Sequence, residues 1–282
     1  MNEHIWRSST ETAQNMNEHI SHSGTQAAQN MTEDIWRNSH DPHDLLAALY
    51  PMYTLGSVRP QTRQSRMYLL ACARRAGTWA RLPVVCRALV ALAEMCAEAP
   101  RQQEGLRAAL APIAERLWTS FGEEGDLLEA EAELSALSAT GYPVPAAVLA
   151  QKKARARAAA PGEPVPPLED DEWKGLARLV YLPFESNTPR YEWVPVELHS
   201  ERLLREVYGR PYAFVPFLAD WRTDNVTRIA RRVYTAREFS AMPILADALQ
   251  DAGCDDDDLL AHCRNGRRHV RGCWVLDQIL NH

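Results

Sequence analysis

Apolar residues recur every three or four positions through the first half of the chain, which is the spacing of one helix face. The first stripe follows Asp41 and Pro42, residue types that suit a helix cap and the first helical position. It contains Leu45, Leu46 and Leu49. Four more stripes follow at Met67, Leu70 and Ala71; Val85, Leu89, Leu92 and Cys96; Leu106, Leu110, Ile113 and Leu117; and Leu127, Ala130, Leu134 and Leu137. Short connections favour antiparallel neighbours, so residues 31–150 are predicted to form an all-α bundle or stack.

The pattern changes after residue 172, where aromatic side chains become frequent between Trp173 and Trp221. Prolines at positions 183, 189, 195, 211 and 216 exclude long helices across most of this stretch. A short strand or extended segment is compatible with residues 192–198. Helices are predicted over 201–208, ended by Gly209, and then after the capping residue Thr223.

Three more short helices are predicted before residue 282. One opens at Ser240 and Pro243 and is stopped by Gly253, one begins within residues 255–258, and the last spans His269 to Leu280. The fold class that follows is mainly α, with little or no strand. It is an N-terminal helical bundle or stack joined to a small, mostly helical, aromatic-rich C-terminal domain over residues 173–282.

Two segments lack apolar periodicity. Residues 151–172 run from basic to alanine-rich to proline-rich to acidic, a composition typical of an exposed linker. Residues 1–45 repeat a 15-residue unit whose copies start at Met1, Met16 and Met31. Fifteen polar residues bury too little apolar area to offset chain ordering, so residues 1–30 are predicted to be a disordered duplicated leader. Translation could start at any of the three methionines.

Composition excludes several classes of protein. The chain has 282 residues, 46% of them hydrophobic, and a net charge of −6, so it is not a basic protein that binds polyanions as a whole. No apolar run approaches the length that spans a bilayer, and the N-terminus lacks the apolar core of a signal peptide. Six cysteines in so long a chain without an export signal predict reduced thiols and a cytoplasmic location.

The segment from Glu238 to Leu280 resembles LPILADALxxAGC, HCR and HVRGCWVVDLLL, the closing signature of a large paralogous family of uncharacterised planctomycete-type bacterial proteins. Residues 203–226 are similar to that family's LLRxIFGNPFRPVxxDPAWRTPxV, and residues 228–249 to its ALARxIYxERxFxxLPxLADAL. Weaker similarity covers TEDIWRNSHDPHDLL at Thr32 and RMYLLACARRAGTW at Arg66, where Ala71 departs from the pattern. The resemblance implies a family and no catalytic residue.

Cysteines and histidines gather near the C-terminus. His269 and Cys273 are four residues apart, so one predicted helix face would carry both, as in zinc sites with ligands at one-turn spacing. Cys254, with His262 or Cys263, could complete a tetrahedron. The spacing between Cys254 and Cys263 is wider than in usual structural zinc sites, which favours thiols that fill the core. No metal or other cofactor is therefore predicted, with zinc as the alternative.

The same segment supplies a predicted structural core. Trp274 lies on the apolar side of the last predicted helix with Cys273 and Asp277, and Leu245 and Leu249 are expected to line its site. A carboxylate at position 277 needs a donor, because an unpaired buried charge is costly.

No motif of a known active site occurs, and no catalytic residue is predicted. The favoured hypothesis is a non-enzymatic helical module that binds an unidentified protein partner, neither nucleic acid nor membrane. The alternative is a zinc-stabilised regulator that binds nucleic acid through the basic cluster between Arg264 and Arg271.

Overall fold

The computed structural model describes residues 33–54, 62–75, 79, 82–99, 103–119, 124–139, 170–184, 194, 198–212, 216–266 and 268–282. Within these ranges every regular element is an α-helix or a short 3-10 helix, which confirms the predicted mainly α fold. The predicted leader 1–30 lies outside the described residues, as do nearly all of the linker and most of segment 192–198. None of the described helices is long and apolar enough to cross a bilayer.

The chain divides into two compact units, and one of them is discontinuous in sequence. The first unit combines Met1–Pro60 with Ser200–His282, and the second is Gln61–His199. This division differs from the predicted one, which placed residues 31–150 together and separated them from 173–282. Two segments explain the difference. Residues 42–54 contact residues 201–208 in the first unit, and residues 170–181 pack within the second unit.

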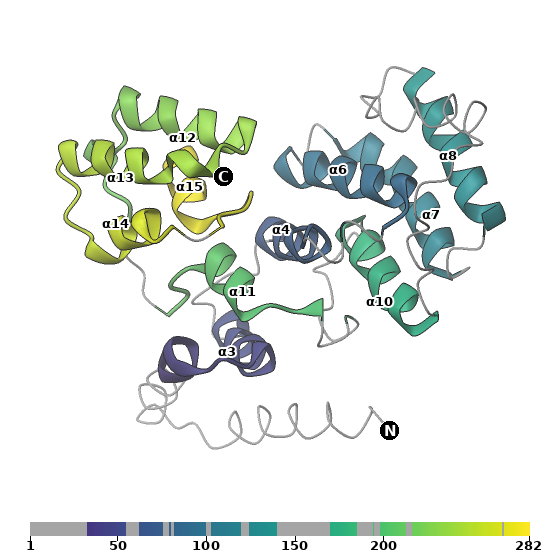
Figure 1. Ribbon diagram of the computed structural model, residues 1–282, viewed down its shortest axis with the longest axis horizontal. Helices are drawn as coiled ribbons and strands as arrows, with labels where there is room; N and C mark the ends of the chain where they lie inside the picture. Colours follow the sequence, from purple (N-terminus) through teal and green to yellow (C-terminus); the bar gives the residue numbers. More distant parts are fainter. Residues whose placement is uncertain are drawn as a thin grey trace. The chain divides into compact units, whose positions relative to one another are not determined.

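The second unit is built from α4 (Thr62–Ala73), α6 (Val84–Glu98), α7 (Glu104–Thr119), α8 (Glu124–Ala139), α10 (Asp170–Tyr181) and the 3-10 helix η1 (Leu182–Phe184) (Figure 1). Helix α6 lies against α4 and α7, and α10 lies against the same two helices. The predicted stripes form the interior: Leu89, Leu92, Leu106, Leu110 and Leu134 are all buried. One face per helix therefore supplies this core.

Helix α10 is not predicted by the sequence pattern, and it corrects the predicted linker at its end. The helix begins at Asp170, so residues 170–172 are helical. Leu176, Leu179 and Val180 are buried at helical spacing, and they place the segment against α4 and α7 in the second unit. Pro183 permits this helix because it follows the last helical residue, Tyr181.

The first unit contains α3 (Pro42–Thr54), α11 (Glu201–Tyr208), η4 (Ala219–Trp221), α12 (Asp224–Ala236), η5 (Phe239–Ala241), α13 (Met242–Asp251), α14 (Asp257–Arg264) and α15 (Trp274–Leu280). Helix α12 lies against α13 and α15, and α14 lies against the same two helices (Figure 1). Helix α11 contacts α15 on one side and α3 on the other.

Local capping chemistry sets the helix starts in this unit. The Ser200 side chain accepts a hydrogen bond from the amide of Leu203, and Thr223 does the same for Val226. Asp256 accepts from the amide of Leu259 at 3.1 Å and so begins α14. These contacts satisfy amide groups that the first helical turn leaves open. The predicted starts of α11 and α12 are confirmed.

The last helix is shorter than predicted. Gly272 has a φ of +84°, a conformation that interrupts a helix, and α15 begins only at Trp274 with Cys273 as its N-terminal cap residue. His269 and Cys273 therefore do not share a helix face. The predicted core residues Leu245, Leu249, Cys273, Trp274 and Asp277 are all buried, and Asp277 lies 3.7 Å from Nδ1 of His282.

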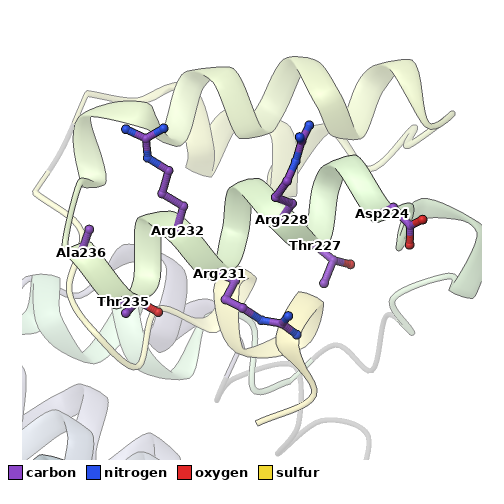
Figure 2. A pocket seen from close by; sticks show the side chains of 7 residues that line it. All are labelled: Asp224, Thr227, Arg228, Arg231, Arg232, Thr235 and Ala236. Carbon is purple, nitrogen blue, oxygen red and sulfur yellow. The ribbon is translucent and has the colours of Figure 1, made fainter.

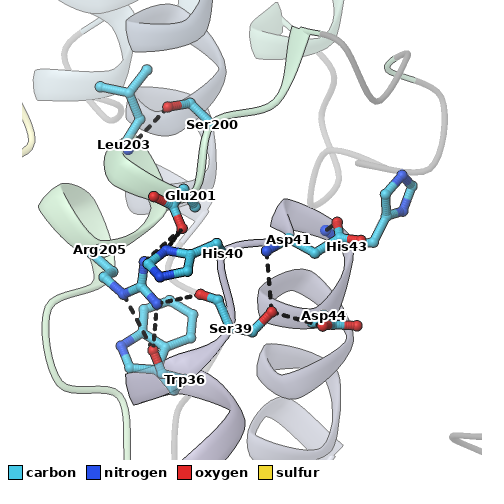
Figure 3. Close-up of polar contacts among 10 residues, drawn as sticks. All are labelled: Trp36, Ser39, His40, Asp41, His43, Asp44, Ser200, Glu201, Leu203 and Arg205. Atoms are coloured by element: carbon cyan, nitrogen blue, oxygen red, sulfur yellow. Dashed lines mark hydrogen bonds and ion pairs between the residues drawn. The ribbon is translucent and has the colours of Figure 1, made fainter.

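Polar contacts join the segment 36–39 to α11, although about 170 residues separate the two in sequence (Figure 3). The guanidinium of Arg205 donates to the carbonyl of Trp36 at 2.9 Å and to that of Ser39 at 2.6 Å. In return the indole N–H of Trp36 donates to the carbonyl of Gly209 at 2.9 Å. Trp36 is 2% exposed and the bonds are partly buried, so they hold residues 33–40 against α11.

Candidate metal centre and arginine face

Four side chains with metal-ligating atoms converge in the first unit. They are Glu206 on α11, His262 on α14, His269 in the loop before α15, and Cys273 at the start of α15. One ligand atom from each lies within 4.8 Å of all the others. Glu206, His269 and Cys273 are buried, and the side chain of His262 is 14% exposed. We call this group the EHHC cluster.

The distances within the EHHC cluster are short. Nδ1 of His269 lies 2.9 Å from Oε1 of Glu206, and Nε2 of His262 lies 3.5 Å from Oε2 of the same carboxylate. The Cys273 Sγ lies 3.2 Å from His262 Nε2 and 4.0 Å from His269 Nδ1. The carboxylate thus lies between the two imidazoles, with the thiol beside both.

Neighbouring packing positions each member of the cluster. Ser200 caps α11 and so sets where the helix begins. Within this helix, Glu206 lies on the same buried side as Leu203 and Val207. The indole N–H of Trp274 donates to His262 Nδ1 at 3.2 Å, which orients that ring. A tryptophan N–H can only donate, so Nδ1 of His262 is the unprotonated nitrogen in this arrangement.

Burial and neighbouring charge shift the ionisation of two members. Burial alone would raise the pKa of Glu206, but hydrogen bonds from His262 and His269 outweigh it and lower that pKa to about 2. Burial, reinforced by the negative charge of Glu206, raises the pKa of the Cys273 thiol well above its ordinary value. Without a metal, the cluster therefore holds an ionised carboxylate and a protonated thiol at neutral pH.

One nitrogen of the cluster has no hydrogen bond. His269 Nε2 is buried and lacks a partner among the described residues, whereas most buried side-chain polar atoms are paired. His269 also lines a surface cavity of about 330 Å³, together with Phe239, Ser240, Met242, Pro243, Cys263, Gly266 and Arg268. The cavity therefore adjoins the cluster on the side of α13.

The structure brings together only part of the predicted zinc set. His269 and Cys273 are close, and His262 joins them, while Cys254 and Cys263 lie outside the cluster of ligand atoms. Both are buried thiols, and burial raises the pKa of Cys263 to about 12. Glu206 is the member that sequence reasoning missed. Its one signal is an acidic residue between the apolar positions Leu203, Leu204 and Val207 of an amphipathic helix.

Of the predicted basic cluster between Arg264 and Arg271, the structure describes Arg264, Arg268 and Arg271. Arg264 pairs with Asp247 at 2.9 Å and donates to Gln250 at 2.7 Å. Arg271 donates to the carbonyls of Tyr234 and Thr235 at the end of α12. Arg267 lies outside the described residues. Two of these arginines thus serve contacts within the unit.

A different arginine-rich surface lies on α12. Arg228, Arg231 and Arg232 are exposed and line a shallow depression, with Asp224, Thr227, Thr235 and Ala236 completing it (Figure 2). We call this surface the arginine face. Arg232 pairs with Glu238 at 3.0 Å, and Arg228 donates to Asn225. Arg231 makes no ion pair or hydrogen bond with any residue that the structure describes.

Comparisons with known proteins add no relative: no family model matches the chain, and neither a curated protein nor a solved structure is found to be similar. The resemblance to the planctomycete-type family therefore stays a prediction.

Proposed function

We propose that the protein is a non-enzymatic helical interaction module whose arginine face binds an acidic segment of a protein partner. The observation that carries this proposal is the exposed row of Arg228, Arg231 and Arg232 on one helix, in which Arg231 has no partner among the described residues. An arginine side chain presents five N–H donors in a fixed fork that matches a carboxylate. Arg231 offers such a fork without a competing contact, and Arg228 and Arg232 each keep further N–H donors beyond their exposed contacts with Asn225 and Glu238. This set favours a partner with several acidic residues.

The composition of the arginine face favours an acidic peptide over nucleic acid. Single strands are held by aromatic rings on which bases stack, and the residues that line the depression include no aromatic side chain. A duplex carries one charge about every 1.7 Å and needs a long basic surface. The net charge of −6 repels any anion that extends beyond the three arginines, so a short acidic segment is disfavoured less than a long nucleic acid.

We also place this module in the cytoplasm. All six cysteines are free thiols and all are buried, which supports a reducing compartment. In the C-terminal part, Cys254, Cys263 and Cys273 all belong to the interior of the first unit.

Fluorescence anisotropy with a labelled Glu-rich peptide tests the proposal. The matched probes are a peptide with Gln in place of Glu and a single-stranded oligo-dT of equal charge. Arg231→Glu should weaken binding of the Glu-rich peptide about fivefold, which corresponds to about 1 kcal/mol for an exposed ion pair. Arg264→Glu is the control, because that arginine is also exposed but already paired with Asp247. Binding should weaken further with added salt.

Equal affinity of the wild type and Arg231→Glu for the Glu-rich peptide would overturn the proposal, as would tighter binding of oligo-dT. A photo-crosslinking amino acid at position 231 then identifies the natural partner. The crosslinked segment must be acidic, and an excess of the Glu-rich peptide must suppress the crosslink. A crosslink to a neutral or basic segment contradicts the proposal.

A further inference from the structure

The geometry points to a zinc site: we propose that Glu206, His262, His269 and Cys273 together bind one Zn²⁺ ion. This inference concerns the interior of the first unit, and it does not depend on the arginine face.

The spacing of the donor atoms fits tetrahedral zinc. Bonds of about 2.0–2.3 Å at tetrahedral angles separate the ligand atoms by roughly 3.3–3.8 Å. In the EHHC cluster the measured separations include 2.9 Å for His269–Glu206, 3.2 Å for His262–Cys273, 3.5 Å for His262–Glu206 and 4.0 Å for His269–Cys273. One ligand atom from each residue lies within 4.8 Å of the others, so shifts of about 1 Å would bring the four atoms to zinc distances.

The chemistry of the donors selects the metal. Two imidazole nitrogens, one sulfur and one carboxylate oxygen form a mixed set that suits a borderline ion such as Zn²⁺, whereas Mg²⁺ and Ca²⁺ prefer oxygen alone. One thiolate and one carboxylate also balance the two positive charges of the ion. The charges of the ion and of its two anionic ligands thereby cancel inside the core, where an unpaired charge is most destabilising.

The position of the site indicates a structural role. Four protein ligands fill a tetrahedron and leave no open position for substrate, as in structural zinc sites. The ligands come from α11, α14 and the segment 269–273 that leads into α15. One ion would thus connect three segments that are separated by as many as 67 residues between Glu206 and Cys273.

The hydrogen bond of Trp274 makes the arrival of zinc detectable. A metal on His262 Nε2 requires the proton of the neutral ring to be on Nδ1. That nitrogen now accepts from the Trp274 indole at 3.2 Å, and two N–H groups cannot remain in this contact. Zinc binding must therefore shift the indole or rotate the imidazole, and it must change the fluorescence of Trp274.

The competing arrangement is a metal-free hydrogen-bond network. In it, Trp274 donates to His262, and both histidines donate toward Glu206. That network keeps its geometry in the presence of a chelator, and zinc does not alter it. The two arrangements therefore predict opposite results.

The test uses the full chain without a histidine tag, dialysed against chelator and then supplied with ZnSO₄ or CoCl₂. Elemental analysis should find about one zinc per chain after removal of free metal. Cobalt should give the visible bands of a tetrahedral site and the charge-transfer band of a thiolate ligand. Zinc should change the tryptophan fluorescence of the wild type, and Trp274→Phe should abolish this change.

Variants assign the ligands. Cys273→Ser should remove the thiolate–cobalt band, and His269→Gln should lower the zinc content to that of the buffer blank. Cys254→Ser and Cys263→Ser are matched controls, because these thiols are also buried in the first unit but lie outside the cluster. Both controls should retain the metal and the band.

Wild-type protein that is helical by circular dichroism yet holds no zinc above the blank would overturn the proposal. Retention of the thiolate–cobalt band by Cys273→Ser would also overturn it. If a ligand variant fails to fold, the cobalt spectrum of the wild type still decides whether a thiolate binds the metal.

Discussion

Replacement of Gly209 by alanine gives a direct test of the packing around Trp274. An added Cβ at position 209 would lie 2.5 Å from Cγ of the Trp274 ring and 2.7 Å from Cδ2, closer than nonbonded carbon atoms approach. Gly209 also has a φ of +62°, which residues with a Cβ rarely adopt. Two costs therefore add at this one position.

Neither side of the contact can move freely. The carbonyl of Gly209 accepts from the indole of Trp36, and the Trp274 indole donates to His262. The guanidinium of Arg210 also lies 5.2 Å from the centre of the Trp274 ring. Overpacking of a tight core costs about 1–3 kcal/mol. Gly209 combines its positive φ with a ψ of −111°, outside the left-handed helical region, and such a backbone costs about 1–3 kcal/mol in a residue with a Cβ. We therefore expect Gly209→Ala to destabilise the first unit by about 2–6 kcal/mol.

The assay is amide hydrogen exchange of peptides from α11 to α15, because it reports the stability of this unit separately from the second one. Gly266→Ala is the control. Gly266 also has a φ of +62°, but no atom lies within 4 Å of its added Cβ. That variant should lose only the strain, about 1–2 kcal/mol. Equal loss of protection in the two variants would refute the argument that a clash between the added Cβ and the Trp274 indole destabilises the unit.

Three further outcomes follow from the same unit. Trp274→Ala should cost about 3–5 kcal/mol in urea unfolding, since it truncates a buried anchor of the core; a loss below 1 kcal/mol would contradict this. Arg205→Lys should cost about 1–2 kcal/mol, because it removes the fork that holds the carbonyls of Trp36 and Ser39; faster exchange should be confined to residues 33–54 and α11. Glu206, ionised in the fold at a pKa of about 2 against an ordinary 4.5, should contribute stability above about pH 4.5 that is lost as the pH falls toward 2. Between pH 7 and pH 3 this loss is about 2 kcal/mol, and urea unfolding at these two pH values should show it for the wild type but not for Glu206→Gln.

Local signals predict most of the C-terminal helices. Ser200 and Thr223 lie where the sequence expects helix starts, and Gly209 ends α11 as expected, because capping and positive φ depend on a few neighbouring residues. The start of the last helix is wrong in the prediction. The apolar spacing continues back to His269, but Gly272 takes a positive φ and interrupts the helix. The spacing of apolar residues alone does not reveal this interruption of the helix.

The sequence predicts only part of the candidate metal site. His269 and Cys273 are close in the chain, and their residue types suggest metal chemistry at once. Glu206 lies more than fifty residues away from His262, and nothing in its local pattern connects it with the histidines. The contact depends on how α11 packs on α15, which is a long-range property. The same reason explains why the joining of residues 33–54 with α11 is not predicted.

The contact between Trp36 and Arg205 has a consequence for synthesis on the ribosome. Residues 33–54 leave the ribosome early, but the helix they pack against follows the roughly 140 residues of the second unit. At about 5–20 residues per second, the early segment waits roughly 7–28 s for its partner. During this time the apolar surface of Trp36, Leu45 and Leu49 stays uncovered while the second unit can already fold. The nascent chain therefore passes through a stage in which chaperones can bind its first helices.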